Sequence, residues 1–355
     1  MLQHLPPPDH SEGIGFQMAI TYGRRWPAPA QVPPVVGELE AIFKALPDEE
    51  LLTKLRGPRR RGPKGYDPKI LWRCYVVLYY LGLPSVSDLV RTLQDNPFIA
   101  SACGIDSPEG IPSQPTFSRF FARMAKRGTY GLLREVHRKL THTLFETLPG
   151  MGKVVAMDGS DLKAWSHGNK KGKGGKVSDP DAGWCVKTNT EGNKKFVWGY
   201  KLHLLVDANH EMPIAMIVTK GNLHDSQKAT ALLRQARYCT NHFFPKYVLA
   251  DSAYSSDHIR NHIRHNYDDC QPVIDPHPSH KRAVAKQQQR PELIPIYRMR
   301  QAVERVFSRL KSHRRMNSVR VRGLFKVQVH ATLSVMTLQA QAVATQTRML
   351  VRRVA

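Results

Sequence analysis

The chain has 355 residues, an ordinary apolar content of 41% and a formal net charge of +24 at pH 7. This length can bury a substantial core and suggests two domains. The positive charge favours a polyanionic partner, with nucleic acid first and an anionic membrane a distant second. No apolar run can span a bilayer, residues 1–10 lack a signal-peptide pattern, and the five scattered cysteines form no C-x2-C pair. These features argue against a membrane protein and against a disulfide or zinc scaffold, and they predict a cytoplasmic protein with reduced thiols.

The first part of the chain is predicted to be a proline-rich arm over residues 1–35, followed by helices. The arm contains Pro6-Pro7-Pro8, and helical periodicity begins near Val36. A basic segment rich in glycine and proline comes next. Its charge indicates either DNA contact or a solvated surface. The candidate DNA contacts in this segment are Arg59, Arg60 and Arg61.

Further helices are predicted over residues 70–83, after Ser85 or Ser87, after a cap at Ser113, and over residues 130–148. Together they form an all-helical domain over residues 36–148, which we expect to bind DNA. The segment 112–126 has two interpretations that are compatible with each other. It can be a core helix built on phenylalanines, or a recognition helix that presents Arg119 and Arg123 to the major groove.

After Pro149-Gly150 the pattern changes to strands, which predicts a second domain over residues 151–350. Alternation over 198–206 and 213–219 predicts a hairpin, and strands are also expected at 247–250 and 272–274. Helices are expected over 256–266 and 326–345, and a long polar loop over 275–295. Two of the apolar runs, 154–158 and 247–251, end in aspartate, namely Asp158 and Asp251.

A helix near the C-terminus reads Tyr297-x2-Arg300-x3-Glu304-x6-Lys311. If it is continuous, these side chains share a stripe of about 60° beside an apolar stripe. A solvated amphipathic helix with charge pairs is the alternative. However, two strand-end acids and one helical acid together are the parts of a Mg²⁺ or Mn²⁺ site, because these ions prefer carboxylate oxygens. Arg300 and Lys311 would then hold phosphate beside the ions.

These residues carry a resemblance to the DDE transposases of bacterial insertion sequences, in the branch with the Tyr-Arg-Glu-Lys signature. The signature matches from Tyr297 to Lys311 without a gap, and the family's first two acids fall on Asp158 and Asp251. The second acid lies within Asp251-Ser252-Ala253-Tyr254, a form of the family's Asp-x-Ala-Tyr pattern. The run from Gly221 to Ser226 is a third match. The resemblance covers residues 150–345 well and residues 40–145 more weakly.

The resemblance implies a ribonuclease-H-like mixed-sheet core after the helical domain, in which Asp158, Asp251 and Glu304 bind two Mg²⁺ ions, or Mn²⁺ as a substitute. Such a protein binds the terminal inverted repeats of an insertion sequence as double-stranded DNA, cleaves there, and joins the freed 3′-hydroxyl to target DNA. The resemblance also implies a homodimer that holds two element ends, associated with the bacterial nucleoid. By the same analogy Asp158 binds both ions.

Other polar residues are candidates with alternatives of their own. Asp161 is an alternative metal ligand, although its interpretation as a surface residue in a turn is favoured. His224 and Asp225 orient a ligand or contact DNA, or they are turn residues bonded to the backbone. Tyr254 stacks on a base near the cut, or it packs against the following helix. A glycine-rich basic loop is a further candidate DNA contact, through Lys170, Lys171 and Lys173.

Three alternative functions differ in what they do to DNA or RNA. A transposase-derived protein without activity would bind DNA and leave it intact. A metal-dependent nuclease would cut without strand transfer. A basic RNA-binding module is the weakest alternative, because nothing resembles an RNA-recognition motif.

Overall fold

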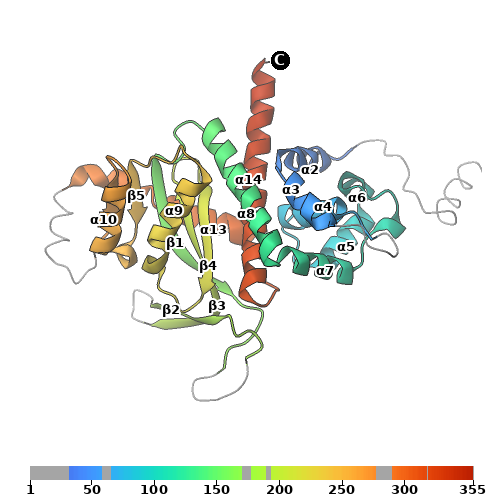
Figure 1. Cartoon of the computed structure of the whole chain (residues 1–355), viewed down its shortest axis with the longest axis horizontal. Coiled ribbons are helices and arrows are strands. Elements are labelled where there is room, and N and C mark those ends of the chain that lie inside the picture. The colour runs from blue at the N-terminus through green and yellow to red at the C-terminus, as the bar shows by residue number, and fades with distance from the viewer. Residues whose placement is uncertain are drawn as a thin grey trace, which may run out of the picture.

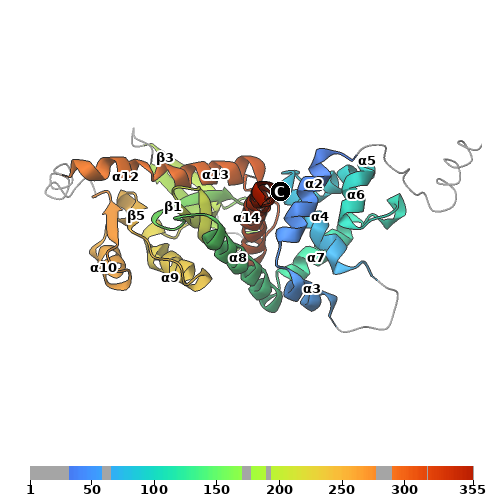
Figure 2. The same cartoon turned by 90° about the horizontal axis from the view of Figure 1, so that it is seen from above.

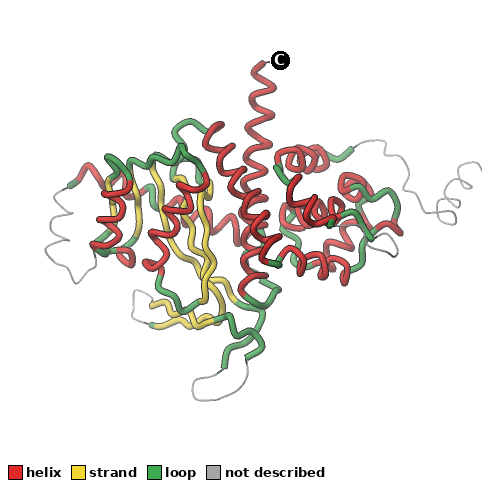
Figure 3. The backbone as a smooth tube through the Cα atoms, viewed as in Figure 1, coloured by secondary structure: helices red, strands yellow, loops and turns green. Residues whose placement is uncertain are grey.

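The computed structural model describes residues 32–57, 65–169, 177–188, 193–276, 290–317 and 319–354. Most of the predicted arm, the cluster Arg59 to Arg61 and the candidates Lys170, Lys171 and Lys173 lie outside these residues. A helical part and a part built on a sheet lie side by side, and α8 and α14 run between them (Figures 1 and 3). None of the described helices is both long and apolar enough to cross a membrane.

The helical part contains the helices expected from the sequence and two short ones that were not expected. Its elements are α2 (Pro34–Ala45), α3 (Glu49–Arg56), α4 (Pro68–Tyr80), α5 (Val86–Asp95), α6 (Pro97–Cys103), the 3₁₀ turn η1 (Pro108–Gly110), α7 (Gln114–Met124) and α8 (Arg127–Thr147). The unexpected helices, α3 and α6, span only about two turns each. So short a segment gives too few repeats of a 3.6-residue period to be recognised.

Two helix starts in the helical part have the side-chain caps that such positions favour. The Asp67 side chain accepts a hydrogen bond from the Lys69 backbone N–H at 2.9 Å, just before Pro68 at the first position of α4. The Ser85 hydroxyl accepts from the Asp88 N–H at 3.1 Å at the start of α5. Ser113 stands at the N-cap position of α7, but its hydroxyl contacts the Thr116 side chain instead of a backbone N–H.

The described strands form one six-stranded mixed sheet in the order β2-β3-β1-β5-β6, with β4 also paired to β3. The pairs β1–β5 and β5–β6 are parallel, whereas β3 is antiparallel to β1, β2 and β4. The predicted hairpin is β3 and β4. The strands are β1 (Val154–Lys163), β2 (Gly183–Thr188), β3 (Lys194–Asp207), β4 (Met212–Lys220), β5 (Tyr247–Ala250) and β6 (Gln271–Ile274).

Helices cover both faces of the sheet (Figure 2). The elements α12 (Ile294–Arg298) and α13 (Gln301–His313) lie on one face, while α9 (Ala229–Cys239) and α10 (Asp257–Asn266) lie on the other. Strand alternation gives each face its own core. Ala156 of β1 packs in the core that contains Val303 of α13, and its neighbours Val155 and Met157 pack in the other core. The remaining short elements are η2 (Asp225–Lys228), η3 (Ser252–Tyr254) and η4 (Pro291–Leu293).

The helix α14 (Leu324–Val354) joins the two parts, because it contributes side chains to both cores. On α14, the buried Gln339 amide donates to Thr141 Oγ1 of α8 at 3.0 Å and to the Pro213 carbonyl of β4 at 2.9 Å. Secondary structure changes between Thr147 and Val154, at the predicted Pro149-Gly150 junction. One core runs from the helical part onto the sheet, so the division into separate domains stays a prediction.

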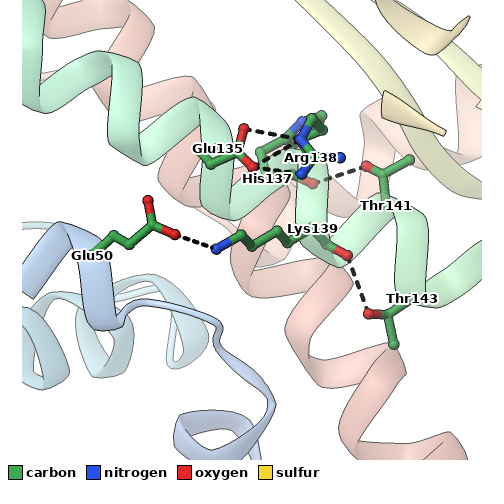
Figure 4. Close-up of polar contacts among 7 residues, drawn as sticks. All are labelled: Glu50, Glu135, His137, Arg138, Lys139, Thr141 and Thr143. Carbon is green, nitrogen blue, oxygen red and sulfur yellow. Dashed lines mark hydrogen bonds and ion pairs between the residues drawn. The ribbon is translucent and has the colours of Figure 1, made fainter. Parts of the chain in front are cut away.

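Polar contacts add to this packing at the surface of α8 (Figure 4). Lys139 of α8 donates to Glu50 of α3 at 2.7 Å, and Glu135 accepts from Arg138 one turn along the same helix. Exposed ion pairs of this kind contribute about 0–1 kcal/mol each. The buried side chains therefore hold α8 in place. All five cysteines are buried, and none of them forms a disulfide.

Asp48, which precedes α3, makes stability depend on pH. It accepts a hydrogen bond from the Trp72 indole, and burial raises the pKa of its carboxyl from 3.8 to about 6. The folded state then binds this proton more tightly than the unfolded state, so the stabilisation is full below pH 3.8 and is lost as the pH rises through 6. After allowance for the partial exposure of Asp48, we expect the free energy of unfolding of Asp48→Asn to be about 1–2 kcal/mol higher than that of wild type at pH 7. At pH 4 the two proteins should be equally stable.

Urea denaturation of both proteins at the two pH values measures this difference. Comparing the two proteins cancels the titration of other groups. A variant that is less stable than wild type at pH 7 would show that the charged form of Asp48 is the favourable one.

Candidate active site

Two of the predicted acids lie next to each other at neighbouring parallel strands. The register of β1 and β5 pairs Ala156 with Leu249, and its extension by two residues brings Asp158 of β1 beside Asp251, which follows β5. Neighbouring strands are about 4.8 Å apart. Burial, helped by the charge of Asp251, raises the pKa of Asp158 to about 6, and burial also raises the pKa of Asp251. Two carboxylates therefore share a partly desolvated place just beyond the parallel pairing of β1 with β5. Asp158 does not end its strand, as the sequence suggested, because β1 continues to Lys163 in antiparallel pairing with β3.

The positive charge of Arg300 acts on both acids. After burial and a backbone hydrogen bond, its charge is among the influences on the pKa of Asp158 and Asp251, and it lowers both. The guanidinium also donates to Glu304 Oε1 at 2.7 Å. Glu304, the third predicted acid, is exposed. Within the described ranges, no group of three His, Cys, Asp or Glu residues is close enough to hold a metal ion.

The signature segment is interrupted, which corrects the expectation of one continuous helix. Tyr297 belongs to α12 and Glu304 to α13, and Arg300 lies in the junction. There, the Arg300 N–H donates to the Tyr297 carbonyl at 2.9 Å and the Val303 N–H to the Arg300 carbonyl at 3.1 Å. Hydrogen bonds to the third preceding residue belong to a 3₁₀ turn, which has 3.0 residues per turn. The helical-wheel angle that placed Tyr297 on the stripe of Glu304 is therefore wrong.

Tyr297 contacts the residue that follows β6, and Lys311 contacts β1. The Tyr297 hydroxyl donates to Asp275, which follows β6, and the Arg300 guanidinium lies 5.9 Å above the Tyr297 ring. Lys311 Nζ donates to the Ser160 hydroxyl of β1 at 2.7 Å. Ser160 is two residues after Asp158, so it is on the same face of the strand. The amine of Lys311 thus lies on the face of β1 that carries Asp158.

A second polar group lies across β1 from Asp158. The Asp225 carboxylate approaches Gly159 so closely that a Cβ at Gly159 would collide with it. Asp225 Oδ1 is 3.2 Å from Lys201 Nζ and 3.4 Å from His203 Nδ1, and His203 Nε2 is 2.9 Å from Thr219 Oγ1. Burial lowers the pKa of His203 to about 4, so the imidazole is neutral at pH 7. Sequence reasoning missed Lys201 and His203 as site residues.

The remaining candidates near the acids take different positions. Asp161 is paired in register with Lys201 and is three residues from Asp158, so it belongs to the opposite face of β1. His224 is exposed and lies 2.8 Å from the Ser226 hydroxyl through Nδ1. Tyr254 is fully buried. A buried ring cannot stack on a DNA base, so the DNA contact expected of Tyr254 is corrected to the packing role.

The predicted recognition helix α7 buries one face and exposes the other. Phe117, Phe120 and Phe121 are buried in the core. Arg119 is exposed and donates to Thr116, whereas Arg123 donates to the Leu55 carbonyl of α3. Arg119 is therefore accessible to DNA, while Arg123 ties α7 to α3.

The described residues form a mixed α/β fold, in which a mixed sheet with helices on both faces carries Asp158 and Asp251 on neighbouring parallel strands. Residues 149–339 match the family model described as transposase DDE domain, and residues 30–123 match the one described as transposase domain (DUF772). The chain belongs to the transposase DDE domain family.

Comparison of structures gives a distant likeness. A cryo-EM structure of the piggyBac transposase synaptic complex with hairpin DNA is 9% identical in sequence, with a TM-score of 0.43. The match covers 90% of this chain and 77% of that one. No curated protein sequence matches the chain.

Proposed function

We propose that this transposase cleaves DNA at the terminal inverted repeats of an insertion sequence and joins the 3′-hydroxyl ends to target DNA. Membership of the transposase DDE domain family supports the reaction class. The observation that carries the assignment of residues is the juxtaposition of Asp158 in β1 with Asp251 directly after the neighbouring parallel strand β5. The net charge of +24 suits a DNA substrate.

The chemistry of the acids fits divalent cations. Asp158 and Asp251 supply carboxylate oxygens side by side, and the pKa of Asp158 is raised, as expected for a buried anion that lacks full neutralisation. Glu304 is exposed and bonded to Arg300 through Oε1, so a change of rotamer is enough to release it. We propose that these three acids hold two Mg²⁺ ions, with Mn²⁺ as a substitute. When bound, such ions activate the attacking oxygen and stabilise the leaving oxygen.

The basic residues around the acids would bind and orient the phosphate. Arg300 and Lys311 carry their charges to the face of β1 that holds Asp158, where each can donate to a phosphate oxygen. Tyr297 fixes Arg300, because its ring lies under the guanidinium and its hydroxyl is held by Asp275. Water and then a DNA 3′-hydroxyl act as successive nucleophiles. Neither Tyr254 nor Tyr297 is proposed to form a covalent bond with DNA.

Two element ends must be held together for joining, so we propose a homodimer as the functional unit, at the bacterial nucleoid. DNA contacts outside the acids are proposed for His224, Arg119, and the basic segments around residues 59–61 and 170–173. Arg123 is a weaker candidate, because its guanidinium already binds a backbone carbonyl.

The test incubates purified protein with labelled duplexes that carry the inverted repeats flanking its reading frame, in Mg²⁺ or in chelator. We expect Mg²⁺-dependent cleavage at the repeat end and joined products with a target plasmid. Binding without any cleavage would identify a DNA-binding protein without activity. Cleavage without joined products would identify a nuclease, and either result would overturn the proposal.

A further inference from the structure

A cavity of about 360 Å³ lies at the seam between the helical part and the start of α14. Its wall on the sheet side contains Trp165, which follows β1, and four cations that belong to residues 315–326. Its wall on the helical side includes Ser118 of α7, the helix that also exposes Arg119. Figure 1 shows the start of α14 beside α7 and α8. The cations are Arg315, Arg320, Arg322 and Lys326.

The charges of this seam are poorly compensated within the protein. Arg315 is 9% exposed, donates to the Pro84 carbonyl, and has a buried Nε without a hydrogen-bond partner. In the part of the chain that the structure describes, Arg315, Arg322 and Lys326 form no ion pair with a carboxylate. Like charges that are held together repel each other, so an anion that binds here gains affinity from these three cations, while Arg320 has the charge of Asp88 near it.

Trp165 is a large aromatic residue that this seam leaves exposed. It is 55% exposed, and the Arg320 guanidinium lies 5.3 Å above its ring. The guanidinium orders the ring and occupies one side of it. An exposed, ordered indole beside cations matches the two chemical features of a nucleic-acid strand, which are a flat base and a charged phosphate.

We propose that the seam is a DNA-binding site in which Trp165 stacks on a base while Arg320, Arg322 and Lys326 hold the phosphates of the same strand. This inference rests on the proposed function and adds a site to it. The chain runs extended along β1 from Asp158 towards Trp165, and the Ala164 N–H still donates to the Trp198 carbonyl. Seven extended residues span at most about 24 Å. The contacted base therefore lies within about seven steps of the cleaved phosphate, at 3.4 Å per step.

The experiment measures the affinity of the full chain for a fluorescent duplex carrying the terminal repeat, over a series of salt concentrations. We expect Trp165→Ala to weaken binding ~10- to 100-fold with an unchanged salt slope, because stacking displaces no counterions. Trp165→Phe should keep most of the affinity. Arg322→Ala should reduce the slope of log K against log salt by about 0.9, because one phosphate contact is lost.

Tyr238→Ala is the matched control, because Tyr238 is a 69% exposed aromatic residue on α9, away from the seam. It should leave binding unchanged. Duplexes with one abasic position then locate the base: at that position, Trp165→Ala should cause no further loss. The proposal that the seam binds DNA would be overturned if Trp165→Ala bound DNA as tightly as wild type, or if it changed the oligomeric state and not the DNA affinity. Failure of the wild type to bind any DNA would instead overturn the proposed function.

Discussion

Asp158→Asn is expected to lose DNA cleavage while it keeps DNA binding. The carboxylate lies beside Asp251, and an amide in its place cannot supply the negative charge that a divalent ion requires. Loss of about 4 kcal/mol of transition-state stabilisation lowers the rate on the order of 10³-fold. Affinity for DNA should stay the same or rise slightly, because the variant has one negative charge fewer near the phosphate.

The matched control is Asp161→Asn, which makes the same chemical change three residues along β1 on its opposite face. Cleavage time courses at saturating DNA, with anisotropy measured in parallel, separate chemistry from binding. Glu304→Gln should resemble Asp158→Asn. Equal cleavage by wild type and Asp158→Asn, or a larger loss of cleavage in Asp161→Asn, would show that other acids hold the metal ions.

Elements with strong periodicity were predictable because their buried side chains lie within one segment. In α2, Leu39 and Ile42 are both buried and three residues apart, as the sequence indicated. The unpredicted α9 has no side-chain cap, and its start after η2 gives no local signal. In β2, Trp184 and Val186 are exposed. Apolar side chains on the open face of a strand remove the inside–outside contrast on which a strand prediction depends.

The two neighbouring aspartates of the site could be predicted because each of them ends an apolar run in the sequence. Residues that tertiary contacts bring to the site could not be predicted in this way. Parallel pairing of β1 with β5 places Asp158 beside Asp251, and the apolar runs that end in these two acids could be recognised in the sequence. The 3₁₀ turn at Arg300 was not visible, because the residues around it suit an α-helix equally well. The approach of Asp225 to Gly159, with Lys201 and His203 behind it, joins three distant segments. Local sequence patterns contain no information about contacts between segments that are distant in the sequence.

Asp179→Ala is expected to destabilise the fold strongly. The Asp179 side chain is 1% exposed and accepts from the Tyr200 hydroxyl at 2.7 and 2.8 Å and from the Gly323 N–H at 3.2 Å. Tyr200 is fully buried in β3, and Gly323 immediately precedes α14. Removal of the acceptor leaves two donors without partners and creates a cavity. These losses together cost about 3–5 kcal/mol of unfolding free energy.

The control is Asp181→Ala, which removes a partly exposed carboxylate that accepts from the Leu324 N–H at 3.0 Å. Water can replace that acceptor, so about 1 kcal/mol or less should be lost. The shift in urea midpoint measures both variants. Because Asp179 anchors the residues before α14, limited proteolysis of the variant should also begin near residues 319–323. A midpoint for Asp179→Ala no lower than that of Asp181→Ala would show that the Tyr200 hydroxyl and the Gly323 N–H find other acceptors, and that packing alone positions the start of α14.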